Sequence, residues 1–277
     1  MCRWIAYRGE SISLDRYVTA PAHSLVVQSL NSFEGNAVVN GDGFGMGWYS
    51  PGLDTPGLYK EVRPAWSDEN LRHLAHHIRS DLFFAHVRAA TGTPTTRQNC
   101  HPFASGRWMF MHNGQLGDWS LIRRQVEAMI PDKYYGQRIG TTDSEAMFLA
   151  MLGAGLESDP VGATERTVRH IAGLVRQSGT DEPLRFTAAL ANGRDLYAFR
   201  FSFNGSANTL YLRKAGDDAV IVSEPLDLDR SHWEPVPPGS MVVVRGGRPV
   251  ERLPFLRDEQ AAEAEPGKPV PLAAAAE

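Results

Sequence analysis

The sequence predicts an α+β fold whose sheets are largely antiparallel. Short apolar runs, which are typical of buried strands, gather toward both ends of the chain, and segments with helical periodicity lie between them. Strands and helices do not alternate, so the βαβ units of a parallel sheet are not expected. The 277 residues, 42% hydrophobic and 22% charged, suffice for one large domain or two small ones with a real core.

The predicted strands are short apolar or alternating segments bounded by turn residues. Asn192-Gly193 indicates a hairpin, because this dipeptide favours the tight turn between two antiparallel strands. The segments expected to form strands are 82–87, 108–111, 186–190, 196–201, 209–212, 219–222 and 241–244.

Four helices are predicted in the middle of the chain, each opened by a residue type that favours a helix start. The fourth also ends at a glycine, Gly179, which completes the common pattern of proline early and glycine late. The expected first residues or caps are Ser67, Asp118, Asp143 and Pro160.

Composition and charge exclude several classes of function. The net charge is −4 with acids and bases interspersed, so neither nucleic acid nor an anionic membrane is an expected partner. No apolar run approaches the roughly 18 residues that span a bilayer, and no signal peptide is visible. Two cysteines are too few for a disulfide framework and fit a reducing cytoplasm. Residues 2–256 are expected to form the domain, and 257–277, rich in Glu, Ala and Pro, a disordered tail.

Cys2 directly follows the initiator Met1. Because cysteine is small enough to permit methionine removal, Cys2 can become the mature N-terminus and carry a thiol and a free α-amine together. Their reference pKa values are about 8.5 and about 7.7–8.0, so the amine can serve as the base without a histidine. By itself Cys2 can equally be a small apolar residue at the start of a strand. Cys100 is expected to be a free thiol in the core.

Four further segments follow Cys2 along the chain: His86–Thr91, Asn99–Pro102, His112–Gly114 and Thr142–Glu145. In this order, behind an N-terminal cysteine, they resemble the glutaminase domain of class II glutamine amidotransferases, which belong to the N-terminal nucleophile hydrolase superfamily. The resemblance covers most of residues 2 to about 225. It implies a four-layer αββα sandwich of two mostly antiparallel sheets between helix layers, with Cys2 as the catalytic nucleophile.

Hydrolysis of a carboxamide also needs donors for the oxyanion that forms on attack. Asn113 and Gly114 follow the predicted strand 108–111, where the chain is expected to turn sharply and to point a side-chain amide and a backbone N–H at one oxygen. An ordinary Asn-Gly turn is the alternative. The resemblance assigns the oxyanion role to Asn113 and Gly114.

Arg88 is expected at the end of the strand 82–87, where a buried arginine needs a partner. Its planar guanidinium group can form two parallel hydrogen bonds to the carboxylate of a ligand. The alternative is that Arg88 forms a structural ion pair within the protein. The resemblance implies that Arg88 holds the α-carboxylate of glutamine, with help from Thr91 and His101.

Asp143 stands at the predicted start of a helix, where aspartate is a favoured cap. The resemblance instead assigns it the α-ammonium group of the substrate. The two interpretations are compatible only if the cap belongs to Thr142 or Ser144. Together Arg88 and Asp143 would read both charges of an α-amino acid and so select a γ-glutamyl head group.

Three further patterns are assigned no catalytic role. Gly41–Trp48 lacks the context of a phosphate site and resembles the family's second strand, whose glycines let the cysteine segment lie close. Ser223–Leu226 is interpreted as structure or pocket wall. His73, His76 and His77 share a helix, but no third ligand with comparable spacing supports a metal site. Neither a metal nor a cofactor is expected.

The resemblance therefore implies hydrolysis of the γ-carboxamide of glutamine, or of a γ-glutamyl amide or peptide, by Cys2 through a γ-glutamyl thioester. No synthase or transferase domain follows, which indicates a stand-alone member with a small-molecule γ-glutamyl substrate. Two alternatives stay open. One is a glutaminase subunit that supplies ammonia to a separate synthetase or partner subunit. The other is a catalytically silent γ-glutamyl-binding regulatory protein, against which the intact Cys2, Asn113 and Gly114 argue.

Overall fold

The first strand, β1 (Arg3–Ser13), shows how the layers are built. Successive side chains of a strand point to opposite faces of the sheet. Ile5 and Tyr7 therefore pack in the core beneath one group of helices, whereas Trp4 and Ala6 pack in a second core between two sheets. All four side chains are buried because both faces of this sheet are covered.

The computed structural model describes residues 2–257 except 36, 91 and 217. Its strands are β1, β2 (Phe44–Trp48), β3 (Gly57–Glu61), β4 (Arg79–Val87), β5 (Phe103–Ser105), β6 (Trp108–Leu116), β7 (Leu184–Ala191), β8 (Asp195–Phe203), β9 (Tyr211–Ala215), β10 (Asp218–Val222), β11 (Glu234–Pro235), β12 (Ser240–Arg245) and β13 (Glu251–Pro254). Its α-helices are α1 (Asp15–Val18), α2 (Leu25–Leu30), α3 (Glu69–His77), α4 (Trp119–Glu127), α5 (Asp132–Tyr135), α6 (Asp143–Gly153) and α7 (Pro160–Ser178).

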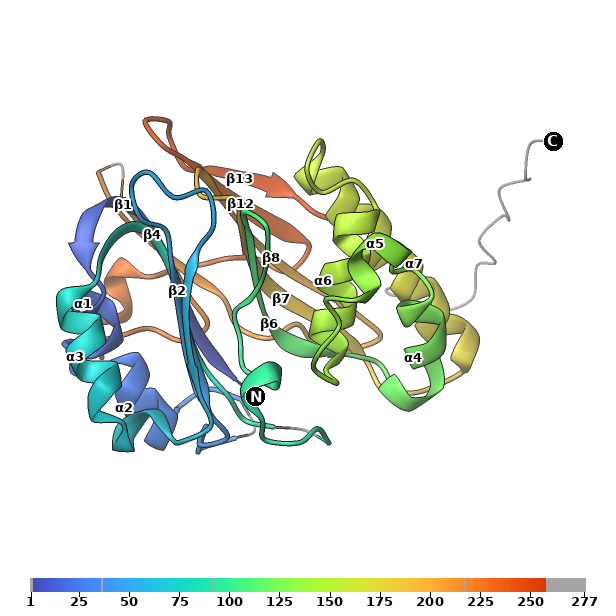
Figure 1. Ribbon diagram of the computed structural model, residues 1–277, viewed down its shortest axis with the longest axis horizontal. Helices are drawn as coiled ribbons and strands as arrows, with labels where there is room; N and C mark the ends of the chain where they lie inside the picture. Colours follow the sequence, from blue (N-terminus) through green and yellow to red (C-terminus); the bar gives the residue numbers. More distant parts are fainter. Residues whose placement is uncertain (1, 36, 91, 217, 258–277) are drawn as a thin grey trace.

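Two antiparallel sheets lie face to face between two helix layers (Figure 1). The seven-stranded sheet has the order β11-β9-β10-β1-β4-β2-β3 and is covered by α1, α2 and α3. The six-stranded sheet has the order β13-β12-β8-β7-β6-β5 and is covered by α4, α6 and α7. The predicted α+β class and the αββα sandwich are confirmed.

Most of the predicted elements form, with shifted boundaries. The Asn192-Gly193 hairpin joins β7 and β8, and Gly193 has φ +85°, a conformation that glycine adopts readily. The first predicted helix begins at Glu69, and its cap is Asp68 rather than Ser67, since the Asp68 carboxylate accepts a hydrogen bond from the Leu71 N–H at 2.8 Å. The short helices α1, α2 and α5 were not predicted.

The glycines of β2 have a different neighbour from the expected one. β4 lies between β1 and β2, so the Cys2 segment does not pack directly on β2. A Cβ atom on Gly45 would lie 2.1 Å from the carbonyl oxygen of His101, and one on Gly47 would lie 2.7 Å from the Pro102 ring. These glycines therefore leave room for the 101–102 segment, of which His101 lines the cavity described below.

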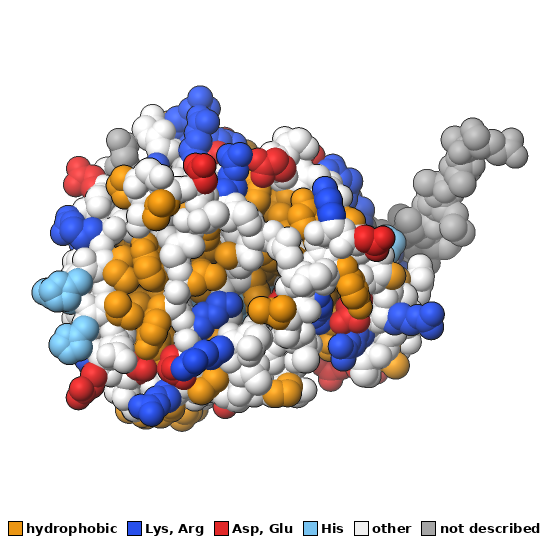
Figure 2. Space-filling model, viewed as in Figure 1, with side chains coloured by type: hydrophobic (Ala, Val, Ile, Leu, Met, Phe, Trp, Pro, Cys, Tyr) orange, Lys and Arg blue, Asp and Glu red, His pale blue; other side chains and the backbone are white. Residues whose placement is uncertain are grey.

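Figure 2 shows acidic and basic side chains intermixed on the face that it presents, in keeping with the net charge of −4. None of the helices in the described part of the chain combines the length and the apolar composition needed to cross a bilayer. The predicted tail lies outside the described residues except for Arg257.

Candidate active site

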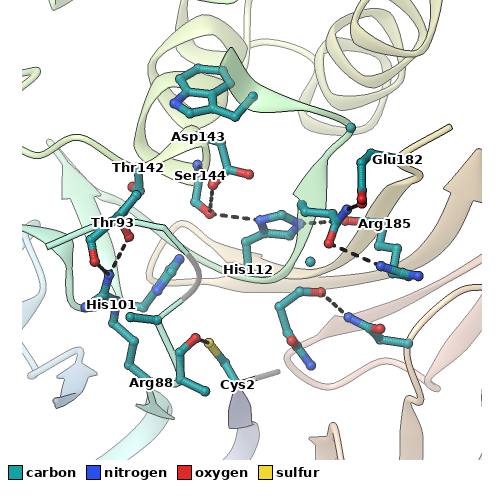
Figure 3. Close-up of a pocket in the computed structure, with 18 of the residues that line it drawn as sticks. Cys2, Arg88, Thr93, His101, His112, Thr142, Asp143, Ser144, Glu182 and Arg185 are labelled. Atoms are coloured by element: carbon teal, nitrogen blue, oxygen red, sulfur yellow. Dashed lines mark hydrogen bonds between the residues drawn. The ribbon is translucent and has the colours of Figure 1, made fainter. Parts of the chain in front are cut away.

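A cavity of about 380 Å³ opens where the first residues of the chain, the ends of β4 and β6 and the start of α6 meet (Figure 3). It brings together every predicted site residue that the structure describes: Cys2, Arg88, His101, Asn113, Gly114 and Asp143. Thr91 lies outside the described residues. These positions are far apart in the sequence, so the convergence is a property of the fold.

Cys2 is half-buried at the floor of this cavity, just before β1. Because Arg3 pairs with Val87 across β1 and β4, Cys2 lies beside the residues that follow β4, and its Sγ donates to the carbonyl of Ala89 at 3.6 Å. Burial raises the pKa of the Cys2 thiol, and the positive charge of Arg88 opposes that rise. The group is therefore held mainly as a thiol, which needs a base before it can attack.

Asn113 and Gly114 lie within β6, where they pair with Thr187 and Phe186 of β7. The prediction of a sharp turn at this dipeptide was wrong. The strand accommodates Gly114 because the neighbouring chain occupies the space of a side chain. A Cβ atom there would lie 1.9 Å from the Arg185 carbonyl oxygen.

The backbone of β6 directs the Gly114 N–H to the open edge of the strand. Two residues further on, the Leu116 N–H donates to Asp143 Oδ2 at 3.2 Å, on the side away from β7. N–H groups two residues apart in a strand point the same way, so Gly114 presents its N–H on that side too. Asn113 also lines the cavity, and Asn208 Nδ2 fixes its backbone carbonyl at 3.0 Å.

Arg88 is buried at the end of β4 and has no ion pair within the described residues. Its Nη2 donates to the Thr93 hydroxyl at 2.6 Å, and its Nη1 donates to the carbonyl of Asp42 at 3.4 Å. The structural ion pair considered above is therefore not found among the residues that the structure describes. A buried guanidinium that faces a cavity without a counter-charge is suited to bind an anion there.

Asp143 is the first residue of α6, but the cap of that helix is Thr142, whose hydroxyl accepts from the Glu145 N–H at 3.2 Å. Asp143 Oδ1 accepts from the Ser144 N–H at 2.6 Å and lies 3.0 Å from the Ser144 hydroxyl, and Oδ2 accepts from the Leu116 N–H as above. A carboxylate has about four acceptor positions, so at least one remains for a cation in the cavity. Because Thr142 and not Asp143 caps the helix, a ligand-binding role of Asp143 is compatible with the start of α6.

Two buried histidines lie beside Arg88. The rings of His86 and His101 have centroids 4.3 Å apart, and none of their four ring nitrogens has a hydrogen-bond partner within the described residues. Burial and the nearby Arg88 charge lower the pKa of His86 to about 3, and burial also lowers the pKa of His101. Both rings are therefore neutral, and their nitrogens are enclosed by the surrounding protein.

Residues 17–216 match the family described as class-II glutamine amidotransferases. The chain belongs to this family. The class-II resemblance based on four short segments is thereby confirmed.

Named relatives of this amidotransferase are found among curated proteins and solved structures. The chain is 32% identical to the probable glutamine amidotransferase DUG3 of Saccharomyces cerevisiae, over 88% of this chain and 82% of that protein. It is 30% identical to the gamma-glutamyl-hercynylcysteine sulfoxide hydrolase of Mycolicibacterium smegmatis, over 88% of this chain and 96% of that protein. The solved structure of a glutamine aminotransferase class-II domain protein from Silicibacter pomeroyi matches with 38% identity and a TM-score of 0.72, over 92% of this chain and 99% of that chain.

The structure of the candidate site adds residues that sequence reasoning missed. His112 Nδ1 lies 2.9 Å from the Ser144 hydroxyl, and His112 Nε2 lies 2.9 Å from the Arg185 carbonyl (Figure 3). Since a carbonyl only accepts, Nε2 carries the proton. The Ser144 hydroxyl also lies 3.0 Å from Asp143 Oδ1, so its single proton is shared between that carboxylate and His112 Nδ1. This bridge ties β6 and β7 to the start of α6. Thr93 was missed as well. For His112, the only signal in the sequence was its place directly before Asn113.

Acid should destabilise the amidotransferase fold through its buried histidines. Below about pH 6.5 the unfolded chain protonates His86, whereas the folded chain does not until about pH 3. In that window each such histidine lowers the free energy of unfolding by about 1.4 kcal/mol per pH unit as the pH falls. The free energy of unfolding, measured with denaturant at several pH values, should depend less steeply on pH in His86→Gln than in wild type. Equal slopes would contradict the neutral, buried state of His86.

Proposed function

We propose that this amidotransferase hydrolyses the γ-amide bond of glutamine or of a γ-glutamyl peptide, with Cys2 as the nucleophile once Met1 has been removed. The observation that carries the proposal is the lining of one cavity by Cys2, the oxyanion candidates Asn113 and Gly114, and two groups of opposite charge, Arg88 and Asp143. An α-amino acid carries a carboxylate and an ammonium group, so this pair of charges matches its head.

The proposed reaction proceeds in two steps. The α-amine of Cys2 takes the thiol proton, Sγ attacks the γ-carbonyl carbon, and the resulting oxyanion accepts from the Asn113 side chain and the Gly114 N–H. The C–N bond then breaks as the leaving amine receives the proton, which leaves a γ-glutamyl thioester on Cys2. Water attacks this thioester with the same base and donors, and glutamate is released with the free thiol.

The lining of the cavity beyond Cys2 favours a leaving group larger than ammonia. Beyond Cys2, at the end opposite Arg88, the cavity is lined by Glu182 and Arg185 (Figure 3). Gln115 connects them, since its Nε2 donates to Glu182 at 2.8 Å and its Oε1 accepts from Arg185 at 3.2 Å. Such polar groups suit the charged ends of an amino acid or peptide. The similarity to a γ-glutamyl hydrolase points in the same direction.

The test is the release of glutamate from glutamine, glutathione and larger γ-glutamyl compounds by the full chain. Hydrolysis with the highest kcat/KM on a γ-glutamyl peptide supports the proposal in its preferred form. Activity on glutamine alone, with release of ammonia, favours a glutaminase that serves a separate synthetase. Binding of these compounds without any glutamate release would instead identify a silent γ-glutamyl-binding protein.

Substrate analogues test the two charged groups separately. Wild type should reject glutamine analogues that lack either the α-carboxylate or the α-amine. Arg88→Ala should no longer distinguish the decarboxylated analogue from glutamine, and Asp143→Ala should no longer distinguish the deaminated one. Each lost charge-assisted hydrogen bond costs on the order of 1.5–3 kcal/mol, or about tenfold or more in kcat/KM.

Arg97 provides the control for this comparison, because its exposed side chain pairs with Glu61 instead of facing the cavity. Arg97→Ala should keep wild-type discrimination. If Arg88→Ala and Asp143→Ala also keep it, both residues are structural and the γ-glutamyl assignment loses its main physical support.

A further inference from the structure

A buried ion pair lies directly behind the candidate nucleophile. Arg3 Nε donates to Glu224 Oε2 at 2.7 Å, and both side chains are no more than 1% exposed. Arg3 Nη1 donates in addition to the backbone carbonyl of Cys2 at 2.9 Å. One guanidinium thus connects the backbone of the nucleophile to a carboxylate on the segment that follows β10.

The carboxylate of Glu224 is held firmly by further donors. Its Oε1 lies 2.6 Å from His23 Nε2 and accepts from the Phe33 N–H at 2.8 Å. Its Oε2 accepts from the Glu34 N–H at 3.1 Å as well as from Arg3. Each oxygen therefore has two partners, which fills the capacity of a carboxylate. Glu224 cannot shift without breaking contacts to the separate segment 23–34.

The start of β1 is anchored at the same place. The Trp4 N–H donates to the Ser223 hydroxyl at 2.9 Å, and the Ser223 N–H donates to the Trp4 carbonyl at 3.1 Å. Arg3 and Trp4 are thus tied directly to Glu224 and Ser223, and Cys2 is tied to the same segment through Arg3. The anchor acts on the backbone that carries both the thiol and, after loss of Met1, the amine.

Stability alone is a poor reason for this arrangement. Buried ion pairs are often no more stabilising than apolar side chains of the same volume, because removing two charges from water is costly. Arg3 Nη2 is moreover buried and has no hydrogen-bond partner within the described residues, which adds a further cost. The pair does, however, fix the position of one particular backbone carbonyl.

We infer that Arg3, held in place by Glu224, is a positioning residue that orients Cys2 for attack; this inference rests on the function proposed above. The amine and the thiol of Cys2 share one Cα, so a fixed carbonyl restricts the directions in which both can point. A misplacement of about 1 Å can cost about 10²-fold in rate. Arg3 also brings positive charge close to the thiol and lowers its pKa against the larger raising effect of burial.

The experiment compares Arg3→Met and Arg3→Lys with the parent chain, all carrying Cys100→Ser so that a single thiol is followed. Glutamine is the probe for kcat and KM, and iodoacetamide is the probe for the rate of Cys2 alkylation as a function of pH. Arg3→Met should lower kcat by about tenfold or more, leave KM within about twofold and move the alkylation profile to higher pH. Arg3→Lys keeps a positive charge for Glu224 but loses the planar guanidinium, so its kcat and its alkylation profile should lie between those of the parent chain and those of Arg3→Met.

Arg213→Met is the matched control. Arg213 lies on β9 of the same sheet and pairs with Asp227 at 3.1 Å, without contact to Cys2. Its loss should affect thermal stability but neither kcat nor the alkylation profile. Wild-type kcat and alkylation in Arg3→Lys would overturn the inference, even if Arg3→Met fails to fold. If the parent chain releases no glutamate, the proposed function fails, while the alkylation profile still decides the role of Arg3.

Discussion

Replacement of Cys2 by alanine should abolish glutamate release while leaving substrate binding largely intact. The change removes the only atom proposed to form a covalent bond with the substrate, and the two groups proposed to hold the substrate's charged head, Arg88 and Asp143, stay in place. Turnover should fall to the detection limit, whereas the Kd for glutamine, measured by calorimetry, should change by no more than a few-fold. Cys100→Ser is the matched control, because its hydroxyl can take over the contact of the buried thiol with the Thr96 carbonyl.

The same mechanism requires a free α-amine on Cys2, so intact-mass measurement of active protein should show that Met1 is absent. Active enzyme that retains Met1 would contradict the mechanism, because an acylated amine cannot take the thiol proton. Near-wild-type turnover in Cys2→Ala would remove this residue from the reaction altogether. Loss of turnover in both cysteine variants would point to a general packing defect instead.

The sequence predicts the fold class because its strongest local patterns are those that the fold uses. The 19-residue helix α7 has its proline at the start and Gly179 in the left-handed conformation at the end, as expected from the sequence. The helices α1 and α2, with four and six residues, are too short to show a helical repeat. They are stabilised by burial of residues such as Tyr17 and Leu25 against the sheet, which no local pattern contains.

The candidate site was predictable to the extent that its residues belong to short segments that follow one another in a recognisable order along the chain, as Arg88 and Asp143 do. Asn113-Gly114 was placed wrongly in a turn, because the carbonyl of Arg185 that makes glycine necessary there lies on another strand. Pairing between Arg3 and Glu224 across the whole chain could not be read from either residue alone. Sequence patterns report local preference, whereas these contacts are set by the packing of distant strands.

Asn113→Ala should lower kcat by roughly 10²–10³-fold with a smaller effect on KM, as expected for the loss of one oxyanion donor. Asn113 lines the cavity, and the hydrogen bond from Asn208 reaches only its backbone carbonyl, which alanine retains. The pairing of β6 with β7 also uses backbone groups alone. The substitution should therefore lower the rate far more than it lowers stability. Steady-state kinetics together with thermal unfolding measure the two effects.

The chain contains a second Asn-Gly pair that serves as an internal control. Asn192 Oδ1 accepts from the N–H groups of Arg194 and Asp195 at 3.0 and 2.8 Å, so this side chain stabilises the hairpin between β7 and β8. Asn192→Ala should lower the melting temperature and leave kcat unchanged, the reverse of the pattern expected at Asn113. If both variants lose stability and activity in parallel, Asn113 has the structural role of Asn192, and the oxyanion must be stabilised by other groups.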